Sequence, residues 1–150
     1  MRVGRVAGRV RAALPATMAD AILAHARAAL PNEACGLIAG DAPFSAGGRP
    51  LRWIPTRNAL ASPYRFEIHP DDLLRQTLAI DDAGEVVWAI VHSHVASPAR
   101  PSPSDLREAR HPAALQLIAS TEATSADPAA GGPSLRAWTA DGQEIELAIS

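Results

Sequence analysis

The spacing of apolar residues predicts a first helix near the start of the chain. Over residues 16–30, apolar residues including Ile22 and Ala26 recur at helical intervals and form one stripe. Thr17 is a residue type that commonly caps a helix N-terminus, and Pro31 is expected to end the helix. The stripe predicts that this helix packs against a core through one face.

A second helix is predicted over residues 70–83. Pro70 suits a first helical turn, and the two aspartates that follow it lie at the positive end of the helix dipole. Leu74 and Leu78 stand four residues apart and form the expected apolar seam. Gly84 provides the stop signal after the last turn.

Short β-branched and apolar runs, bounded by glycine, proline and other turn residues, predict strands. They cover residues 10–14, 33–40, 51–56, 64–68, 86–91, 114–120, 135–139 and 144–149. The runs at 33–40 and 86–91 are almost wholly apolar, which is typical of interior strands buried on both faces. The last two runs form a predicted hairpin, and the Ala-, Gly-, Ser-, Thr- and Pro-rich segment 121–133 is expected to be a flexible loop.

Alternating strands and amphipathic helices predict a mixed α/β fold. We expect one domain over residues 9–150, built on a curved sheet with the 16–30 helix on one side and the 70–83 helix on the other. Residues 1–8 carry two arginines and no clear periodicity, so they are expected to form a loose basic arm.

Composition narrows the class of protein. The chain has 150 residues, 47% of them apolar, a net charge of −2 and one cysteine. The near-neutral charge argues against nucleic acid as an obligatory partner, and one cysteine cannot form an internal disulfide. No apolar run approaches the ~18–20 residues that span a bilayer, and we expect a cytoplasmic protein without membrane contact.

The candidate chemistry begins where the 86–91 strand ends, at His92-Ser93-His94. Alternate residues of a strand point to the same face, so the two histidines are expected to project together. Asp105 follows after a loop long enough to fold back. Two imidazoles and one carboxylate are a recurrent catalytic zinc set that leaves a fourth position open.

A purely structural interpretation of the same segment is also available. Residues 102–105 read Ser-Pro-Ser-Asp, a good helix start with Ser102 as N-cap and Asp105 at the third helical position. Asp105 would then only pair with free amides, and His92 and His94 would be a polar rim. The two interpretations of Asp105 are compatible, because a capped first turn is a rigid place from which to present a ligand.

Two residues of the 33–40 strand are further candidates. Glu33 opens a strand that is otherwise apolar, so its carboxylate is well placed to face a site at the end of the sheet. Cys35 raises the question of a nucleophilic thiol, but its apolar neighbours favour a small buried side chain.

Together these residues resemble the signature of the JAMM (MPN-plus) zinc metalloproteases, and of their small prokaryotic branch in particular. The likeness rests on Glu33 and on the spacing His92-x-His94-x7-Ser102-x2-Asp105. It extends from about residue 14 to 149, and includes Asn58 and the segment 62–68. One departure is Val95, which stands where the family usually has proline.

The resemblance implies an MPN-type domain over residues 9–150 and a zinc peptidase or isopeptidase. His92, His94 and Asp105 would bind Zn²⁺, Glu33 would act as general base and acid, and Ser102 would donate to the oxyanion. It further implies cleavage after the C-terminal Gly-Gly tail of a ubiquitin-like or sulfur-carrier protein.

Two other functions are compatible with parts of the pattern. One is an inactive scaffold of the same fold, although all three ligands and Glu33 are present. The other is a non-haem iron enzyme, because two histidines and a carboxylate also bind Fe(II), although there the usual order of ligands differs. A zinc deaminase is excluded, because its signature needs more than one cysteine. The sequence does not define the oligomeric state.

Overall fold

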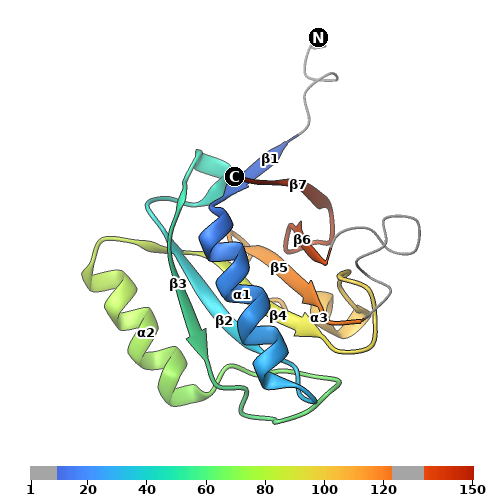
Figure 1. Ribbon diagram of the computed structural model, residues 1–150. Coiled ribbons are helices and arrows are strands. Elements are labelled where there is room, and N and C mark those ends of the chain that lie inside the picture. Colours follow the sequence, from blue (N-terminus) through green and yellow to red (C-terminus); the bar gives the residue numbers. More distant parts are fainter. Residues whose placement is uncertain (1–9, 123–133) are drawn as a thin grey trace.

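A computed structural model describes residues 10–122 and 134–150. The predicted arm 1–8 and most of the predicted loop 121–133 therefore lie outside the described residues. Figure 1 shows a curled sheet with helices on both sides, which confirms the predicted mixed α/β architecture. Among the described helices, none is both long and apolar enough to cross a bilayer.

The described strands form one seven-stranded sheet in the order β1-β7-β6-β5-β4-β2-β3. The strands are β1 (Arg11–Leu14), β2 (Cys35–Gly40), β3 (Pro50–Thr56), β4 (Val86–His94), β5 (Leu115–Ser120), β6 (Leu135–Trp138) and β7 (Glu144–Ile149). The helices are α1 (Ala16–Ala29), α2 (Pro70–Asp82) and α3 (Pro103–Arg107), with a short 3-10 turn, η2 (Phe44–Ala46). The predicted hairpin is present as the antiparallel pair β6–β7.

Helix α1 covers one face of the sheet through its predicted stripe. Ile22 and Ala26 are buried and belong to the same apolar cluster as Ile38 of β2 and Leu117 of β5. The helix begins one residue before the predicted cap: its N-cap is Pro15, which makes no side-chain capping bond. The Thr17 prediction is therefore wrong, because Thr17 already lies inside the first turn.

Helix α2 covers the opposite face, but through a different stripe from the predicted one. Ile80 is buried and Leu73 is partly buried against this face, whereas Leu74 and Leu78 are 62% and 57% exposed. The predicted seam of Leu74 and Leu78 is therefore wrong. The end of the helix is as predicted, with Gly84 in a left-handed conformation (φ 72°) just beyond the last turn.

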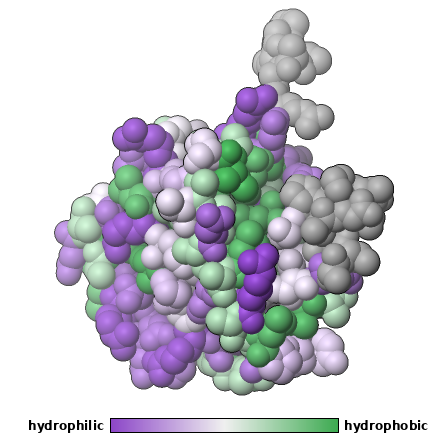
Figure 2. Space-filling model, viewed as in Figure 1, coloured by the Kyte–Doolittle hydropathy of each residue, from purple (hydrophilic) through white to green (hydrophobic). Residues whose placement is uncertain are grey.

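The rotation of α2 is fixed at its N-terminus by a buried carboxylate. Asp72 accepts hydrogen bonds from the Arg57 backbone N–H (2.9 Å), Nε (3.1 Å) and a terminal guanidinium nitrogen (2.8 Å). These bonds turn Asp72 toward the end of β3. Because the orientation of the first turn sets that of the whole helix, Leu73 and Ile80 then face the sheet. Figure 2 shows hydrophilic residues gathered at the lower left, the corner that α2 occupies in Figure 1.

Residues 57–68 are not the strand that the sequence predicts for 64–68. They form a loop in which only Asn58 and Ile68 make a β-bridge. The Asn58 side chain replaces the missing ladder: its amide donates to the carbonyls of Glu33 (3.0 Å) and Arg65 (3.1 Å), and its oxygen accepts from the Glu67 N–H (3.1 Å). The sequence predicts a strand at residues 64–68, but the backbone of this segment forms hydrogen bonds with the Asn58 side chain and not with a neighbouring strand.

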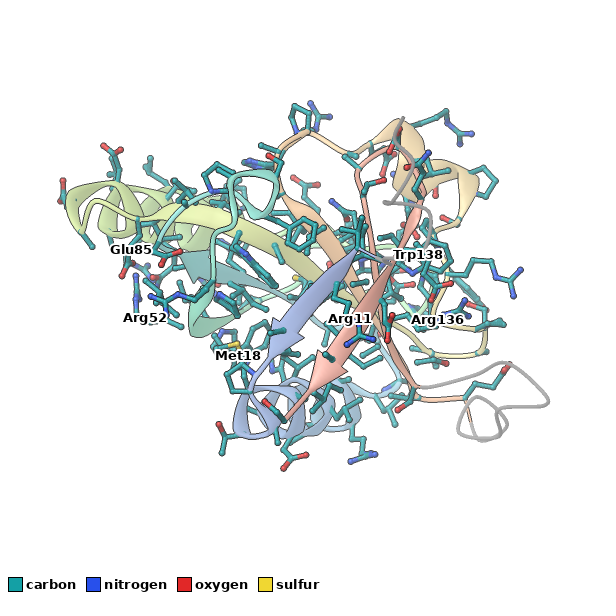
Figure 3. The ribbon with its side chains drawn as sticks, turned by 90° about the horizontal axis from the view of Figure 1, so that it is seen from above. Arg11, Met18, Arg52, Glu85, Arg136 and Trp138 are labelled. Atoms are coloured by element: carbon teal, nitrogen blue, oxygen red, sulfur yellow. The ribbon has the colours of Figure 1, made fainter. Side chains whose placement is uncertain are left out.

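Two pairs of side chains that line the sheet are labelled in Figure 3. Arg52 of β3 pairs with Glu85, directly before β4. Within β6, the Arg136 guanidinium lies 5.0 Å from the centre of the Trp138 ring. Trp138 in turn contacts the loop that carries the candidate site residues, as described below.

The Arg57–Asp72 contact gives a stability prediction. Hydrogen bonds from Arg57 hold the pKa of Asp72 well below its usual range, so the ionised form stabilises the folded state. Asp72→Asn should lower the free energy of unfolding by about 1 kcal/mol at pH 7. Because the folded pKa is depressed, this difference should be full above about pH 4 and should shrink as the pH falls further. Urea unfolding at pH 7 and pH 3 measures it, and an equal difference at both values would contradict the assignment.

Candidate metal centre

His92 and His94 lie at the end of β4 and face the same side of the sheet as α2. Both are buried, and β4 is long enough to include them, three residues beyond the predicted end at 91. In the parallel pair with β5, His92 lies opposite Ile118 and His94 opposite Ser120. The two imidazoles are therefore held by an interior strand that lies between β2 and β5.

Asp105 reaches the histidines from the first turn of α3. Ser102 Oγ accepts from the Asp105 N–H (3.0 Å), and Asp105 Oδ2 accepts from the Ser102 N–H (2.9 Å). This is the reciprocal capping box that the Ser-Pro-Ser-Asp sequence predicts. The box fixes the Asp105 carboxylate, so capping and presentation to the histidines occur together.

The loop between β4 and α3 is tied down along its length. Trp138 Nε1 donates to the carbonyl of the buried Ala99 (3.0 Å), and Ser120 Oγ donates to the Ser97 carbonyl (2.7 Å). His94 Nδ1 lies 2.8 Å from the Pro98 carbonyl. These anchors come from β4, β5 and β6.

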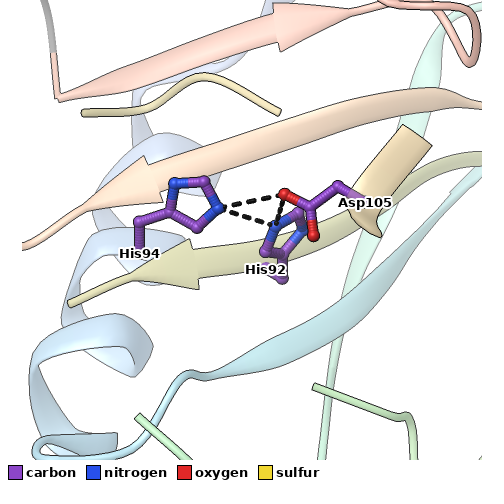
Figure 4. Close-up of side chains that lie close together, drawn as sticks. All are labelled: His92, His94 and Asp105. Carbon is purple, nitrogen blue, oxygen red and sulfur yellow. Dashed lines mark hydrogen bonds and ion pairs between the residues drawn. The ribbon is translucent and has the colours of Figure 1, made fainter. Parts of the chain in front are cut away.

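Three ligand atoms converge at this point (Figure 4). The Nε2 atoms of His92 and His94 are 3.3 Å apart, and Asp105 Oδ2 lies 3.3 Å from the first and 3.1 Å from the second. Tetrahedral zinc with bonds of about 2.0–2.1 Å places its ligand atoms about 3.3–3.4 Å from one another. The triangle therefore fits a small tetrahedral ion, and this trio is a group of described residues able to hold a metal.

The surroundings set the tautomer of His94 and the charge of His92, while hydrogen bonds with Asp105 and the Pro98 carbonyl outweigh burial and raise the pKa of His94. The Pro98 carbonyl accepts from protonated Nδ1 of His94, which leaves Nε2 with its lone pair toward the triangle. Burial lowers the pKa of His92 and keeps its imidazole neutral. The Phe66 ring stacks on His92 with centroids 4.3 Å apart, so the imidazole plane is fixed as well.

Glu33 lies beside the triangle. The Ser93 N–H donates to the Ala34 carbonyl (3.0 Å), which continues the β2–β4 register and places Glu33 opposite His94. Glu33 is only 5% exposed, and no hydrogen bond to its carboxylate is found among the described residues. Burial raises the pKa of Glu33 to about 7, with the Asp105 charge adding to the effect and His94 opposing it.

Cys35 is a buried structural thiol in this fold. Its Sγ lies 3.4 Å from both Thr56 Oγ1 and the Arg57 carbonyl, and burial raises its pKa to about 11. A thiol so far from ionisation at neutral pH is a poor nucleophile. The buried interpretation of Cys35 therefore agrees with the structure.

Two residues near the triangle were not predicted from the sequence as site residues. Phe66 was placed in a predicted strand, yet it stacks on a candidate ligand. Gln116 of β5 lies on the site face, opposite Ile90 in register. In the sequence, Gln116 stands out as a polar residue within the apolar run Leu115–Ala119. That pattern does not predict which group its side chain contacts.

The fold and this side-chain group define a hydrolase of the JAB1/MPN structural class. The family model for prokaryotic homologues of the JAB domain matches residues 15–141. The chain belongs to this family and is a JAMM-type hydrolase, which confirms the resemblance found in the sequence.

Named relatives cover most of the chain. It is 40% identical over 106 residues to the CysO-cysteine peptidase of Mycobacterium tuberculosis, across 71% of this chain and 70% of the relative. It is 31% identical over 145 residues to the desampylase of Haloferax volcanii, across 93% of this chain and 96% of the relative.

Solved structures show the same fold. Protein DSY2949 of Desulfitobacterium hafniense superposes with a TM-score of 0.73 at 34% identity, covering 92% of each chain. A JAB1/MPN domain protein of Archaeoglobus fulgidus superposes with a TM-score of 0.57 at 20% identity, covering 92% of this chain and 97% of its own.

The buried carboxylate of Glu33 gives a prediction for the metal-free protein. Its folded pKa is raised, so its ionisation destabilises the fold as the pH rises from about 4.5 to 7. Glu33→Gln should therefore raise the free energy of unfolding by on the order of 2 kcal/mol at pH 8, and hardly change it at pH 4.5. Denaturant unfolding in the presence of a chelator at both pH values measures the difference. A variant less stable than wild type at pH 8 would show that the Glu33 charge is compensated.

Proposed function

We propose that the chain is a zinc-dependent peptidase or isopeptidase that cleaves the amide bond after the Gly-Gly tail of a ubiquitin-like or sulfur-carrier protein. The observation that carries the proposal is the 3.1–3.3 Å triangle of His92, His94 and Asp105 with the buried Glu33 beside it. The relatives support the substrate class, because their names describe a CysO-cysteine peptidase and a desampylase.

His92, His94 and Asp105 would hold the zinc and leave its fourth position open. Zinc, when bound, supplies Lewis-acid polarisation of a carbonyl and lowers the pKa of water to near 7. The protein's part is to keep the three ligands in one geometry. The interior strand β4, the capping box of α3 and the Pro98 carbonyl provide this.

Glu33 would move the proton. A carboxylate whose pKa is about 7 accepts a proton from water and returns it to a leaving amine at neutral pH with little cost in either direction. None of the described residues forms a hydrogen bond with the Glu33 carboxylate, and its backbone is held by Asn58 and by the Ser62 carbonyl. The leaving nitrogen is therefore expected on the Glu33 side of the triangle.

Ser102 would donate to the oxyanion of the tetrahedral intermediate. In the capping box its Oγ accepts from the Asp105 N–H, which uses a lone pair and not the hydroxyl hydrogen. That hydrogen has Ser104 Oγ as its neighbour at 3.1 Å and can turn toward a substrate oxygen instead. Capping and oxyanion donation by Ser102 are then compatible.

The first prediction of this function concerns the metal. Purified protein should carry about one zinc per chain, and His92→Ala or Asp105→Ala should remove most of it because each loses a ligand. Glu33→Ala should retain zinc. Elemental analysis of the dialysed proteins measures the content, and it separates zinc from iron.

A matched control tests whether Asp105 acts only as a helix cap. Ser102→Ala removes the other half of the capping box and leaves all three ligands, so it should keep its zinc. Full zinc occupancy in Asp105→Ala, or equal losses in Asp105→Ala and Ser102→Ala, would count against the ligand assignment.

The second prediction concerns catalysis. Glu33→Gln should keep fold and zinc and lose at least ~10²–10⁴-fold in turnover, the range typical of general acid–base catalysis. Ser102→Ala should lose ~10²-fold through the missing oxyanion donor. Mass spectrometry of a ubiquitin-like or sulfur-carrier protein extended beyond Gly-Gly follows the reaction. Zinc-loaded wild type that binds such a substrate without cleaving it would indicate a scaffold, and unchanged turnover in Glu33→Gln would refute the mechanism.

A further inference from the structure

A cavity of about 500 Å³ opens beside the metal-ligand triangle. It is lined by the first turn of α2, the segment 65–68, the residues that follow α3, and Ile90 and Gln116 of the sheet. Asp105 forms part of its wall, whereas Glu33, His94 and Ser102 do not line it. The cavity therefore begins at one ligand and extends away from the other site residues.

Gln116 is an unusual residue for the floor of this cavity. It is 6% exposed, and the next residue of β5 on the same face, Ile118, is apolar. Among the described residues, nothing forms a hydrogen bond with its side-chain amide. The amide is not enclosed by the protein, because the side chain lines the cavity, so its donors and acceptor are available to a group that enters there.

The sheet register places Gln116 across the triangle from Glu33. Gln116 lies opposite Ile90, two residues before His92 on β4, whereas Glu33 lies opposite His94 on the other neighbouring strand. If Glu33 returns the proton to the leaving amine, the leaving group lies on its side. The cavity then lies on the acyl side, where the substrate tail approaches.

The distance from the triangle to the cavity floor matches a short extended segment. Gln116 is about three residue steps along the sheet and one strand away from the triangle, which is about 11 Å. Two glycines before the scissile bond span about 7 Å, so the side chain of the third residue is the first that can enter the cavity. That residue directly precedes the Gly-Gly pair.

The cavity favours a neutral polar side chain at this position. Apolar walls come from Phe66, Leu73 and Ile90, and at the rim Arg65 is already paired with Glu108 (3.2 Å). The remaining charges of the lining are of both signs, from Glu67 and Asp105 and from Arg110, so the cavity does not single out one sign of charge on an entering side chain. The Gln116 amide offers one acceptor and two donors, which suit a carboxamide or hydroxyl.

We propose that this cavity, next to Asp105, binds the side chain of the residue that precedes Gly-Gly, and that Gln116 makes the cavity selective for a neutral hydrogen-bonding side chain. The inference rests on the proposed function, because it takes the direction of the substrate from the role of Glu33. It names Gln116 as a specificity-determining residue.

The test uses acetyl-Leu-Xaa-Gly-Gly-aminomethylcoumarin peptides in shape-matched pairs, with Xaa as Gln or Met and as Thr or Val. Zinc-loaded wild type should prefer Gln over Met and Thr over Val by about tenfold in kcat/KM, as expected for one hydrogen bond in a buried site. Gln116→Leu should reverse both preferences. Gln143→Leu, at an exposed glutamine, should behave as wild type.

Stability separates this role from a structural one. Gln116→Leu removes a side chain that makes no hydrogen bond with the described residues, so it should leave the melting temperature unchanged or raise it. A fall in melting temperature would show that Gln116 serves the fold, and would overturn the proposal.

Peptide binding can be measured without cleavage, so it tests the cavity independently of the proposed hydrolysis. The chain has three glutamines, and selective ¹⁵N labelling reports their side-chain amides. Addition of acetyl-Leu-Gln-Gly-Gly with a free carboxyl end should shift the Gln116 signals and not those of Gln143, and the Met peptide should bind more weakly. This result without any cleavage would support the cavity and contradict the peptidase.

The remaining outcomes also decide between the two proposals. Cleavage with the same preference in wild type and Gln116→Leu would overturn the inference and leave the peptidase intact. No cleavage together with no change in the Gln116 signals would overturn both.

Discussion

The site depends on the antiparallel register between β2 and β4. Cys35 lies opposite His92, and the ladder continues through the Ser93 N–H and the Ala34 carbonyl. Because alternate residues share a face, this register brings Glu33, His92 and His94 to one side of the sheet. A slip of one residue in β2 would turn Glu33 to the opposite face, away from the histidines.

Helix α3 is too short to be stable alone, and its position follows from contacts with the sheet. Its capping box orients Asp105, and the preceding loop is held through Ala99 by Trp138 and through Pro98 by His94. His94 therefore contributes twice, with Nε2 in the triangle and Nδ1 on the loop that delivers the third ligand atom. The ligand geometry and the loop conformation support each other.

Polar side-chain atoms beside the triangle have no hydrogen-bond partner among the described residues, and one of them, His92 Nδ1, is fully buried. The Glu33 carboxylate and the Gln116 amide have no hydrogen bond within the described chain, and burial raises the pKa of Glu33. Substitutions that make such sites apolar or neutral commonly increase stability at the expense of function. The two residues flank the triangle on opposite sides, where a substrate would supply the missing contacts.

The sequence by itself determined the ligand spacing, the helix start at Ser102 and the buried character of β2 and β4, because these follow from local periodicity and capping. It did not determine which face of α2 is buried, since the contact of Asp72 with Arg57 decides that. It also could not show that Asn58 would replace a strand partner for residues 64–68, or that Gln116 would face the site. Those features depend on contacts between residues distant in sequence, and only the tertiary structure brings them together.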